Sequence, residues 1–320
     1  MKLETIGFYT LSDERAKTAS IASSMMRCEM ILTPACNFKC PYCRGLPKEA
    51  SRHLSKDEIK NGLELWIKDD LQNIRFSGGE PVLHPALVKA VSMCKDAGVK
   101  RIAVSSNGSL KTEKYDALLR AGVNDFSISL DACCASDGDI MAGVSGAWNR
   151  VVENIKHLSK LTYVSVGVVV TDKNIATVCN TIVLADSLGV ADIRVIPAAQ
   201  FTRENSRELE NIPSEILEKH PILKYRITRA LLGHSVRGIS KSDTHRCNLV
   251  LDDSIIAGGH HYPCVIYMRE KGNPIGKVSP TMRGDREAWS KKHNTHNDAI
   301  CSNNCLDVCI DYNNRYAEFH

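Results

Sequence analysis

Three cysteines in the segment CNFKCPYC have the spacing C-x3-C-x2-C. On so short a segment, the thiolates of Cys36, Cys40 and Cys43 can face one metal centre. A structural zinc site is closed by four protein ligands, and the nearest histidine, His53, lies outside the segment. Three protein ligands and one open position are typical instead of an iron–sulfur cluster in which one iron binds another molecule. A zinc site and a purely structural loop remain the alternatives.

A second set of cysteines lies in the C-terminal part of the chain: Cys247, Cys264, Cys301, Cys305 and Cys309. A closed iron–sulfur or zinc site takes four such ligands. The count therefore indicates a second metal site with one thiol to spare, and zinc is the alternative to iron and sulfide. His260 and His261, which lie within this region, are expected to be polar residues of a hairpin rather than ligands. The other cysteines are predicted to be structural: Cys28, Cys94, Cys133, Cys134 and Cys179.

The elements that must position the first cysteines alternate along the chain. Apolar, β-branched runs typical of strands covered on both faces cover residues 28–34, 73–79, 101–108, 124–132, 163–171 and 192–198. Helical patterns lie between them, at residues 55–70, 84–98, 111–122, 146–160 and 174–189. This alternation predicts right-handed βα units and a parallel sheet. Six units are too few to close an eight-stranded barrel, so the predicted fold is α/β, with a partial (β/α)6 parallel barrel.

Beyond residue 198 the alternation ends. The segment TRENSRELENIPSEILEKH is charged and is predicted to be a linker or a solvated helix, and residues 221–234 are predicted to be a helix. In CNLVLDDSIIAGGHHYPC, two apolar runs separated by Asp252 and Asp253 predict a β-hairpin that ends at Gly258 and Gly259. We therefore expect an N-terminal extension at residues 1–27, the partial barrel at 28–205, and a small β-hairpin and helix iron–sulfur domain at 206–320.

Composition argues against several function classes. The 320 residues carry a net charge of +4 without a block of Lys or Arg, which argues against nucleic acid or a membrane surface as a partner. The start of the chain, MKLETIGFYTLSDERAK, is charged, so no signal peptide is expected, and no segment has the length and hydrophobicity of a transmembrane helix. Thirteen cysteines without a secretion signal indicate a cytoplasmic location, where clustered thiols usually bind metals or act in catalysis.

Two segments of the chain resemble motifs of the radical SAM superfamily, and the resemblance covers residues 28 to about 198. CNFKCPYC resembles its C-x3-C-x-aromatic-C motif, and SGGEP (77–81) resembles the segment that binds the methionyl amine of S-adenosylmethionine. The resemblance implies a 4Fe–4S cluster on the three cysteines and S-adenosylmethionine at Gly78, Gly79 and Glu80. Glycine lets the backbone approach a ligand closely, and a carboxylate can accept hydrogen bonds from an ammonium group.

The ends of later strands extend the same resemblance. Asn107 in SSNGS (105–109), together with Ser129 and Asp131 in SISLD (127–131), would line the cofactor, and residues 166–171 and 195–200 would flank its adenine. A helix N-cap is the alternative role for Asp131. The resemblance implies that an electron from the reduced cluster cleaves S-adenosylmethionine, and that the 5′-deoxyadenosyl radical then abstracts a hydrogen atom from the substrate.

The C-terminal cysteines resemble the twitch or SPASM extension of radical SAM enzymes, which implies a second, auxiliary 4Fe–4S cluster. Two ligand sets stay open. Either Cys247 and Cys264 ligate with two of the last three cysteines, or Cys264, Cys301, Cys305 and Cys309 form the full set. In the second case Cys247 is free, and our hypothesis is that its thiol donates a hydrogen atom to a substrate radical.

The resemblance favours a carbohydrate or aminoglycoside-type small molecule as the substrate, epimerised or dehydrogenated, with an external one-electron reductant of the flavodoxin or ferredoxin type. The segment IGFYTLSDERAK (6–17) and the cysteine layout resemble aminoglycoside epimerases. Three other functions are alternatives. A ribosomal-peptide maturase is disfavoured by the short segment before the first strand, and a molybdenum-cofactor-type cyclase by the ending NNRYAEFH. An iron–sulfur scaffold without turnover is disfavoured by SGGEP, because a scaffold does not need a segment that binds S-adenosylmethionine.

Overall fold

The structure is a computed structural model that describes residues 2–6, 11–198 and 207–320. Its internal contacts divide the chain into two compact units. The first unit contains Met1–Ala35, Gly45–Ile102 and Arg237–His320, and the second contains Cys36–Arg44 and Ala103–Val236. The predicted division into residues 1–27, 28–205 and 206–320 stays a prediction. The predictions for residues 7–10 and 199–206, which include Ala199 and Gln200 beside the adenine, lie outside the described residues.

The first unit is built on β1 (Arg27–Thr33), which is buried along nearly its whole length. It pairs in parallel with β2 (Asn73–Gly78) on one edge and with β7 (Asp253–Ala257) on the other. The antiparallel strands β8 (His260–Tyr262) and β9 (Gly276–Lys277) extend the sheet beyond β7. A strand covered on both faces and paired on both edges is a rigid support for the loop that follows it.

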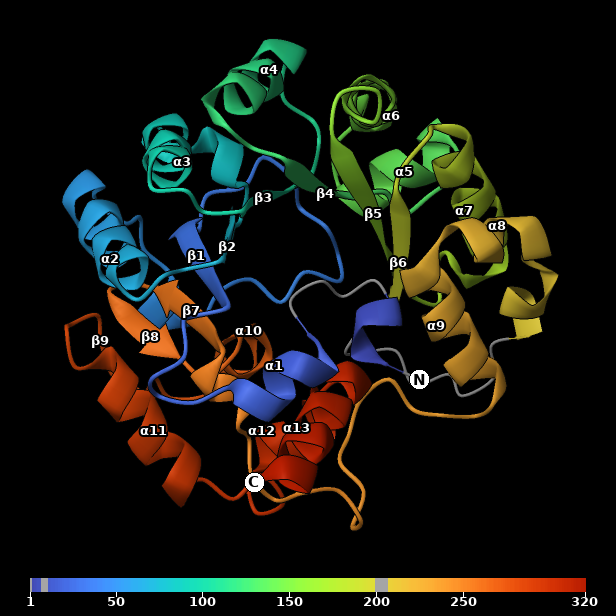
Figure 1. The fold of residues 1–320 in the computed structure, drawn as a ribbon. Helices are drawn as coiled ribbons and strands as arrows, with labels where there is room; N and C mark the ends of the chain where they lie inside the picture. The colour runs from blue at the N-terminus through green and yellow to red at the C-terminus, as the bar shows by residue number, and fades with distance from the viewer. Residues whose placement is uncertain (1, 7–10, 199–206) are drawn as a thin grey trace. The chain divides into compact units, whose positions relative to one another are not determined.

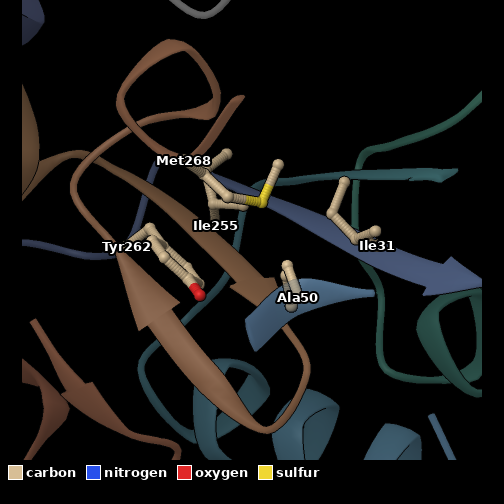
Figure 2. Close-up of a cluster of buried hydrophobic side chains, with 6 residues drawn as sticks. Ile31, Ala50, Ile255, Tyr262 and Met268 are labelled. Atoms are coloured by element: carbon tan, nitrogen blue, oxygen red, sulfur yellow. The ribbon is translucent and has the colours of Figure 1, made fainter. Parts of the chain in front are cut away.

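A compact hydrophobic cluster fixes the C-terminal part of this unit against β1 (Figure 2). Its fully buried members are Ile31, Ala50, Ile255, Ala257, Tyr262 and Met268. Burying each large apolar side chain stabilises the fold by roughly 1.5–3 kcal/mol. The cluster therefore holds β7, β8 and the short helix α10 (Val265–Arg269) in place, and Cys264 directly precedes that helix.

The helices of the first unit follow local sequence signals. In α2 (Lys56–Lys68), Ser55 and Glu58 form a capping box, and Ile59, Leu63 and Trp66 bury one face. The helix α3 (Leu87–Asp96) follows β2. Near the C-terminus lie α11 (Met282–Lys292), α12 (Ala299–Asn304) and α13 (Asp307–Phe319), and α13 packs on α1 (Asp13–Thr18) (Figure 1).

The second unit contains parallel strands in the order β3, β4, β5 and β6, with helices between them (Figure 1). The strands are β3 (Arg101–Ser106), β4 (Asp125–Ser129), β5 (Tyr163–Val170) and β6 (Asp192–Pro197). The helices are α4 (Thr112–Ala121), α5 (Ala135–Ala142), α6 (Ala147–Leu158), α7 (Val178–Ser187), α8 (Ser214–Lys219) and α9 (Pro221–Leu231). One face of β4 and β5 is apolar and buried, whereas Ser127 is half-buried and Ser129 is exposed.

Each of the six predicted strands and six predicted helices overlaps an observed element. The predicted hairpin turn at Asp252 and Asp253 is wrong: Leu249–Leu251 form a 3-10 turn, and the observed hairpin joins β7 to β8 through Gly258 and Gly259. The helices α1, α5, α10, α11, α12 and α13 were not predicted, because they are short or lack strong apolar periodicity, whereas α8 lies in the charged segment that was predicted to be a linker or a solvated helix. Among the described residues, no helix combines the length and hydrophobicity needed to cross a membrane.

Candidate functional site

The cysteine loop, residues 36–44, is held by the ends of three elements of the second unit. The Lys39 N–H donates to the Ala142 carbonyl at the end of α5, at 2.8 Å. The Asn37 amide donates to the Ser109 hydroxyl beyond β3, at 2.7 Å. The Tyr42 hydroxyl donates to the carboxylate of Asp131 beyond β4. These separate attachments fix the path of a loop that has no regular secondary structure of its own.

The three thiols of the cysteine loop lie near one another. The Cys43 N–H donates to the Cys40 carbonyl at 3.0 Å, which closes a turn, and the Phe38 N–H lies 3.4 Å from the Cys36 sulfur. The pKa of Cys40 is raised to about 11, mainly by burial and to a smaller extent by the charges of Asp131, Cys43 and Cys36, while a hydrogen bond with Tyr42 opposes the shift. Cys36 and Cys43 are exposed. Three close thiols, two of them accessible, fit the chemistry of a metal-ligand set with an open face.

The buried carboxylate of Asp131 connects the cysteine loop to β5. Besides the Tyr42 hydroxyl, it accepts a hydrogen bond from the Val169 N–H at 2.7 Å. Burial raises the pKa of Asp131 to about 6, and the hydrogen bonds from Tyr42 and Val169 limit that rise. The alternative of a helix N-cap is wrong, since the residue at the N-cap of α5 is Cys134.

Asn107 also belongs to the surroundings of the cysteine loop. Its side-chain amide donates to the side-chain oxygen of Asn37 at 2.9 Å and lies 3.9 Å from the Cys36 sulfur, while its side-chain oxygen accepts from the Ser109 hydroxyl. Ser129 is exposed at the end of β4. Thus Asn107 and Asp131 lie in the shell of polar residues around the loop, and their contact with a cofactor stays a prediction.

Gly143 supports the cysteine loop through its lack of a side chain. Its φ of +65° belongs to the left-handed region, and a Cβ there would lie 2.5 Å from the Lys39 carbonyl oxygen. Gly143→Ala should therefore add about 1–2 kcal/mol of backbone strain and displace the loop, so that the variant binds less iron and unfolds at a lower temperature. Gly146→Ala is the matched control, because Gly146 has a φ of +72° and open space around it. Equal iron contents in the two variants would contradict this role of Gly143.

In the first unit, the predicted S-adenosylmethionine segment lies against the end of β1. The Gly79 N–H donates to the Thr33 carbonyl and the Glu80 N–H to the Ala35 carbonyl, both at 2.8 Å. The Gly78 carbonyl accepts from Arg269 of α10 at 3.0 Å. Ala35 directly precedes Cys36 in the chain, so SGGEP is anchored to the residue from which the cysteine loop departs.

Glu80 is completely buried and caps a short 3-10 turn, Pro81–Leu83, by accepting from the Val82 N–H at 3.0 Å. The carboxylate is therefore part of the local fold at the end of β2. Gly78 and Gly79 have no room for side chains, because added Cβ atoms would lie 2.4 Å from the carbonyl oxygens of Thr33 and Ala35, respectively. The glycines are required for the close pairing of the ends of β1 and β2.

The five C-terminal cysteines, named here the C-terminal cysteine group, come from four segments of the first unit. Cys247 precedes a 3-10 turn, Cys264 caps α10, Cys301 and Cys305 lie within and at the end of α12, and Cys309 begins α13. Burial and the proximity of other thiols of the group raise the pKa of four members, Cys264, Cys301, Cys305 and Cys309. The pKa of Cys264 is raised to about 12. Burial likewise raises the pKa of Cys247. Several half-buried thiols in one place, ionised only if a cation compensates them, fit a metal or iron–sulfur centre.

Two buried polar side chains that sequence reasoning missed organise this group. The Arg286 guanidinium of α11 is fully buried and donates to the carbonyls of Val250 at 2.8 Å and Pro263 at 3.2 Å. Arg286 thereby joins the chain just after Cys247 to the chain just before Cys264. Because an arginine in a polar helical segment usually faces solvent, the sequence carried no signal that this one is buried.

Asn313 of α13 is the second of these side chains. Its oxygen accepts from the Asn248 and Leu249 N–H groups at 2.7 and 3.0 Å, and its amide donates to the Cys309 carbonyl at 2.9 Å. The same amide lies 3.8 Å from the Cys247 sulfur. Asn313 therefore holds the segment of Cys247 against the helix that carries Cys309.

Comparison with known protein families matches residues 30–185 to the family described as the Radical SAM superfamily. Among curated proteins, molybdenum cofactor biosynthesis protein 1 of Dictyostelium discoideum is 30% identical over 57% of this chain and 27% of its own length. A probable GTP 3′,8-cyclase of Sulfurisphaera tokodaii is 28% identical over 59% of this chain and 62% of its own. AdoMet-dependent heme synthase of Methanosarcina barkeri is 30% identical over 51% of this chain and 48% of its own length. This chain thus spans less than two thirds of each relative.

Solved structures extend the likeness in fold beyond residues 30–185. anSMEcpe with bound AdoMet has a TM-score of 0.61 at 14% identity, over 92% of this chain and 96% of that one. Streptococcus suis SuiB bound to S-adenosylmethionine has a TM-score of 0.60 at 12% identity, over 84% of this chain and 64% of that one. These likenesses concern the fold, and they confirm the predicted fold class of a partial (β/α)6 barrel.

Proposed function

We propose that this chain, which belongs to the radical SAM superfamily, holds a 4Fe–4S cluster on Cys36, Cys40 and Cys43 and uses it for hydrogen-atom abstraction from a small molecule. When bound, the reduced cluster supplies the electron that cleaves S-adenosylmethionine to the 5′-deoxyadenosyl radical. The observation that carries the proposal is the attachment of the cysteine loop, with its three thiols, at three points of the second unit.

The chain's own residues bind and orient in this proposal. The cofactor residues are Gly78, Gly79, Glu80, Asn107, Ser129 and Asp131. The glycines allow the ends of β1 and β2 to pair closely, and the hydrogen bonds of Asn107 and of Tyr42 with Asp131 limit the movement of the cysteine loop. Reduction requires an external one-electron donor, for which we propose a protein of the flavodoxin or ferredoxin type.

We also propose an auxiliary 4Fe–4S cluster on the C-terminal cysteine group. Its support is the convergence of five half-buried thiols, where a cluster needs four. Both ligand sets considered from the sequence remain compatible with this arrangement. Cys247, whose sulfur neighbours the Asn313 amide, is either a ligand or the thiol that donates a hydrogen atom.

For the reaction, we propose epimerisation or dehydrogenation of a carbohydrate or aminoglycoside-type substrate, supported by the spare thiol. Cyclisation of GTP is the second candidate, because several of the matched curated relatives bear the name of GTP 3′,8-cyclase. A peptide substrate is a third, since one solved structure of similar fold holds a precursor peptide. Incorporation of one solvent deuterium into a carbohydrate product would support epimerisation, whereas consumption of GTP by the reduced enzyme would support the cyclase.

The deciding experiment is a count of iron and acid-labile sulfide after anaerobic reconstitution. The wild type should hold about eight irons per chain, and the Cys36/Cys40/Cys43 triple alanine variant about four, as expected for two clusters of four irons. Four irons in the wild type and none in the triple alanine variant would contradict the auxiliary cluster. In Cys247→Ala, retained iron with loss of turnover would identify a hydrogen donor, and loss of about four irons would identify a ligand.

A further inference from the structure

Next to the C-terminal cysteine group lies a histidine that neither the sequence reasoning nor the proposed function uses. The Nε2 atom of His293 lies 3.3 Å from the sulfur of Cys301. Among the described residues, His293, Asp298 and Cys301 bring their potential ligand atoms within 4.8 Å of one another. The imidazole is therefore in direct contact with one sulfur of the group.

The ring of His293 is fixed on two sides by aromatic residues. It stacks on Trp289, one turn earlier at the end of α11, with ring centroids 4.0 Å apart and planes at 17°. The Tyr267 ring meets it edge-on at 5.8 Å. Stacking and edge contacts of this kind restrict a ring to one orientation, so that Nε2 is aimed at Cys301.

Asp298 accepts hydrogen bonds from other groups and lies close to His293, so it bears on which imidazole nitrogen carries the proton. One carboxylate oxygen accepts the N–H groups of Ile300 and Cys301, both at 2.9 Å, and so caps α12. The other accepts the Tyr267 hydroxyl at 3.0 Å and lies 3.9 Å from His293 Nε2. A carboxylate and a thiolate can only accept hydrogen bonds. The imidazole nitrogen that faces them, Nε2, must therefore carry the proton and act as the donor.

We propose that His293 is a positioning residue of the auxiliary site: Cys301 is one of the four cluster ligands, and the Nε2–H of His293 donates a hydrogen bond to its thiolate. This inference rests on the auxiliary cluster of the proposed function. A hydrogen bond to a ligand sulfur withdraws charge from it and stabilises the reduced form. The reduction potential of the auxiliary cluster is therefore more positive than it would be without His293.

The test uses the full-length Cys36/Cys40/Cys43 triple alanine variant, so that iron signals come from the C-terminal cysteine group alone. His293→Phe keeps a ring to stack on Trp289 but removes the donor, whereas His293→Gln keeps an N–H group. Reduction potentials are measured by EPR-monitored redox titration, with iron counted in each variant. His320→Phe, at the exposed C-terminus, is the matched control.

The expected result is four irons in all three variants, a more negative potential in His293→Phe, a smaller shift in His293→Gln, and none in His320→Phe. Pulsed EPR of the reduced protein with ¹⁵N-histidine should detect a weak coupling that disappears in His293→Phe. Four irons with an unchanged potential would overturn the hydrogen bond, and a strong coupling with iron loss in both His293 variants would make His293 a ligand instead. Four irons in an added Cys301→Ala variant would overturn the assignment of Cys301. A triple alanine parent without iron would overturn the auxiliary cluster itself and this role with it.

Discussion

Replacement of any one of Cys36, Cys40 and Cys43 by alanine is expected to abolish reductive cleavage of S-adenosylmethionine. Each change removes one of three protein ligands, and a cluster left with two is lost or cannot keep one iron open for the cofactor. The rate of 5′-deoxyadenosine formation should fall by more than about 100-fold, since loss of a mere outer-shell partner typically brings about 10–100-fold. The measurement is 5′-deoxyadenosine released with dithionite as the reductant.

The control for these variants is Cys94→Ala, which removes a fully buried thiol from α3. Cys94 has a raised pKa caused by burial, as expected for a small apolar side chain of the core. Its replacement should lower the stability of the fold and leave cleavage by the folded enzyme intact. Cleavage retained by any variant of the cysteine loop would remove that residue from the ligand set and weaken the proposed function.

The parts of the fold that were predictable are those with local signals. The capping box of Ser55 and Glu58 fixes the start of α2 in sequence and in structure alike. The apolar runs of the strands are visible because burial on both faces excludes polar residues from them. The spacing of Cys36, Cys40 and Cys43 indicates a shared centre because three residues on one short loop cannot lie far apart.

What could not be predicted depends on contacts between distant segments. The parallel pairing of β7 with β1 joins residues more than two hundred positions apart, and no local pattern specifies it. Arg286 and Asn313 look like surface residues until their helices pack onto the C-terminal cysteine group. The role of Gly143 likewise arises only from its approach to Lys39. Residues that support a site from a distance in sequence thus escape motif reasoning, whereas closely spaced residues such as Cys36, Cys40 and Cys43 do not.

Gly79→Ala is expected to have the second large effect, through the backbone rather than through any lost contact. A Cβ at this position would lie 2.4 Å from the Ala35 carbonyl oxygen and 2.6 Å from that of Pro34. Because both neighbours are backbone atoms, no side chain can rotate away, and the ends of β1 and β2 must separate. Such overpacking costs about 1–3 kcal/mol, and the hydrogen bonds of Thr33 and Ala35 to this segment lengthen with it.

The displaced strand ends connect the stability defect to function, since Ala35 leads directly into the cysteine loop and Gly79 belongs to the predicted cofactor segment. Binding of S-adenosylmethionine to the reconstituted Gly79→Ala variant should therefore weaken by about tenfold or more, which corresponds to about 1.4 kcal/mol, as measured by equilibrium dialysis. Gly284→Ala is the control, because Gly284 lies in α11 with open space around it and alanine favours a helix. If both variants bind the cofactor as the wild type does, Gly79 shapes the strand ends without shaping the cofactor site, and the assignment of SGGEP to S-adenosylmethionine loses its structural basis.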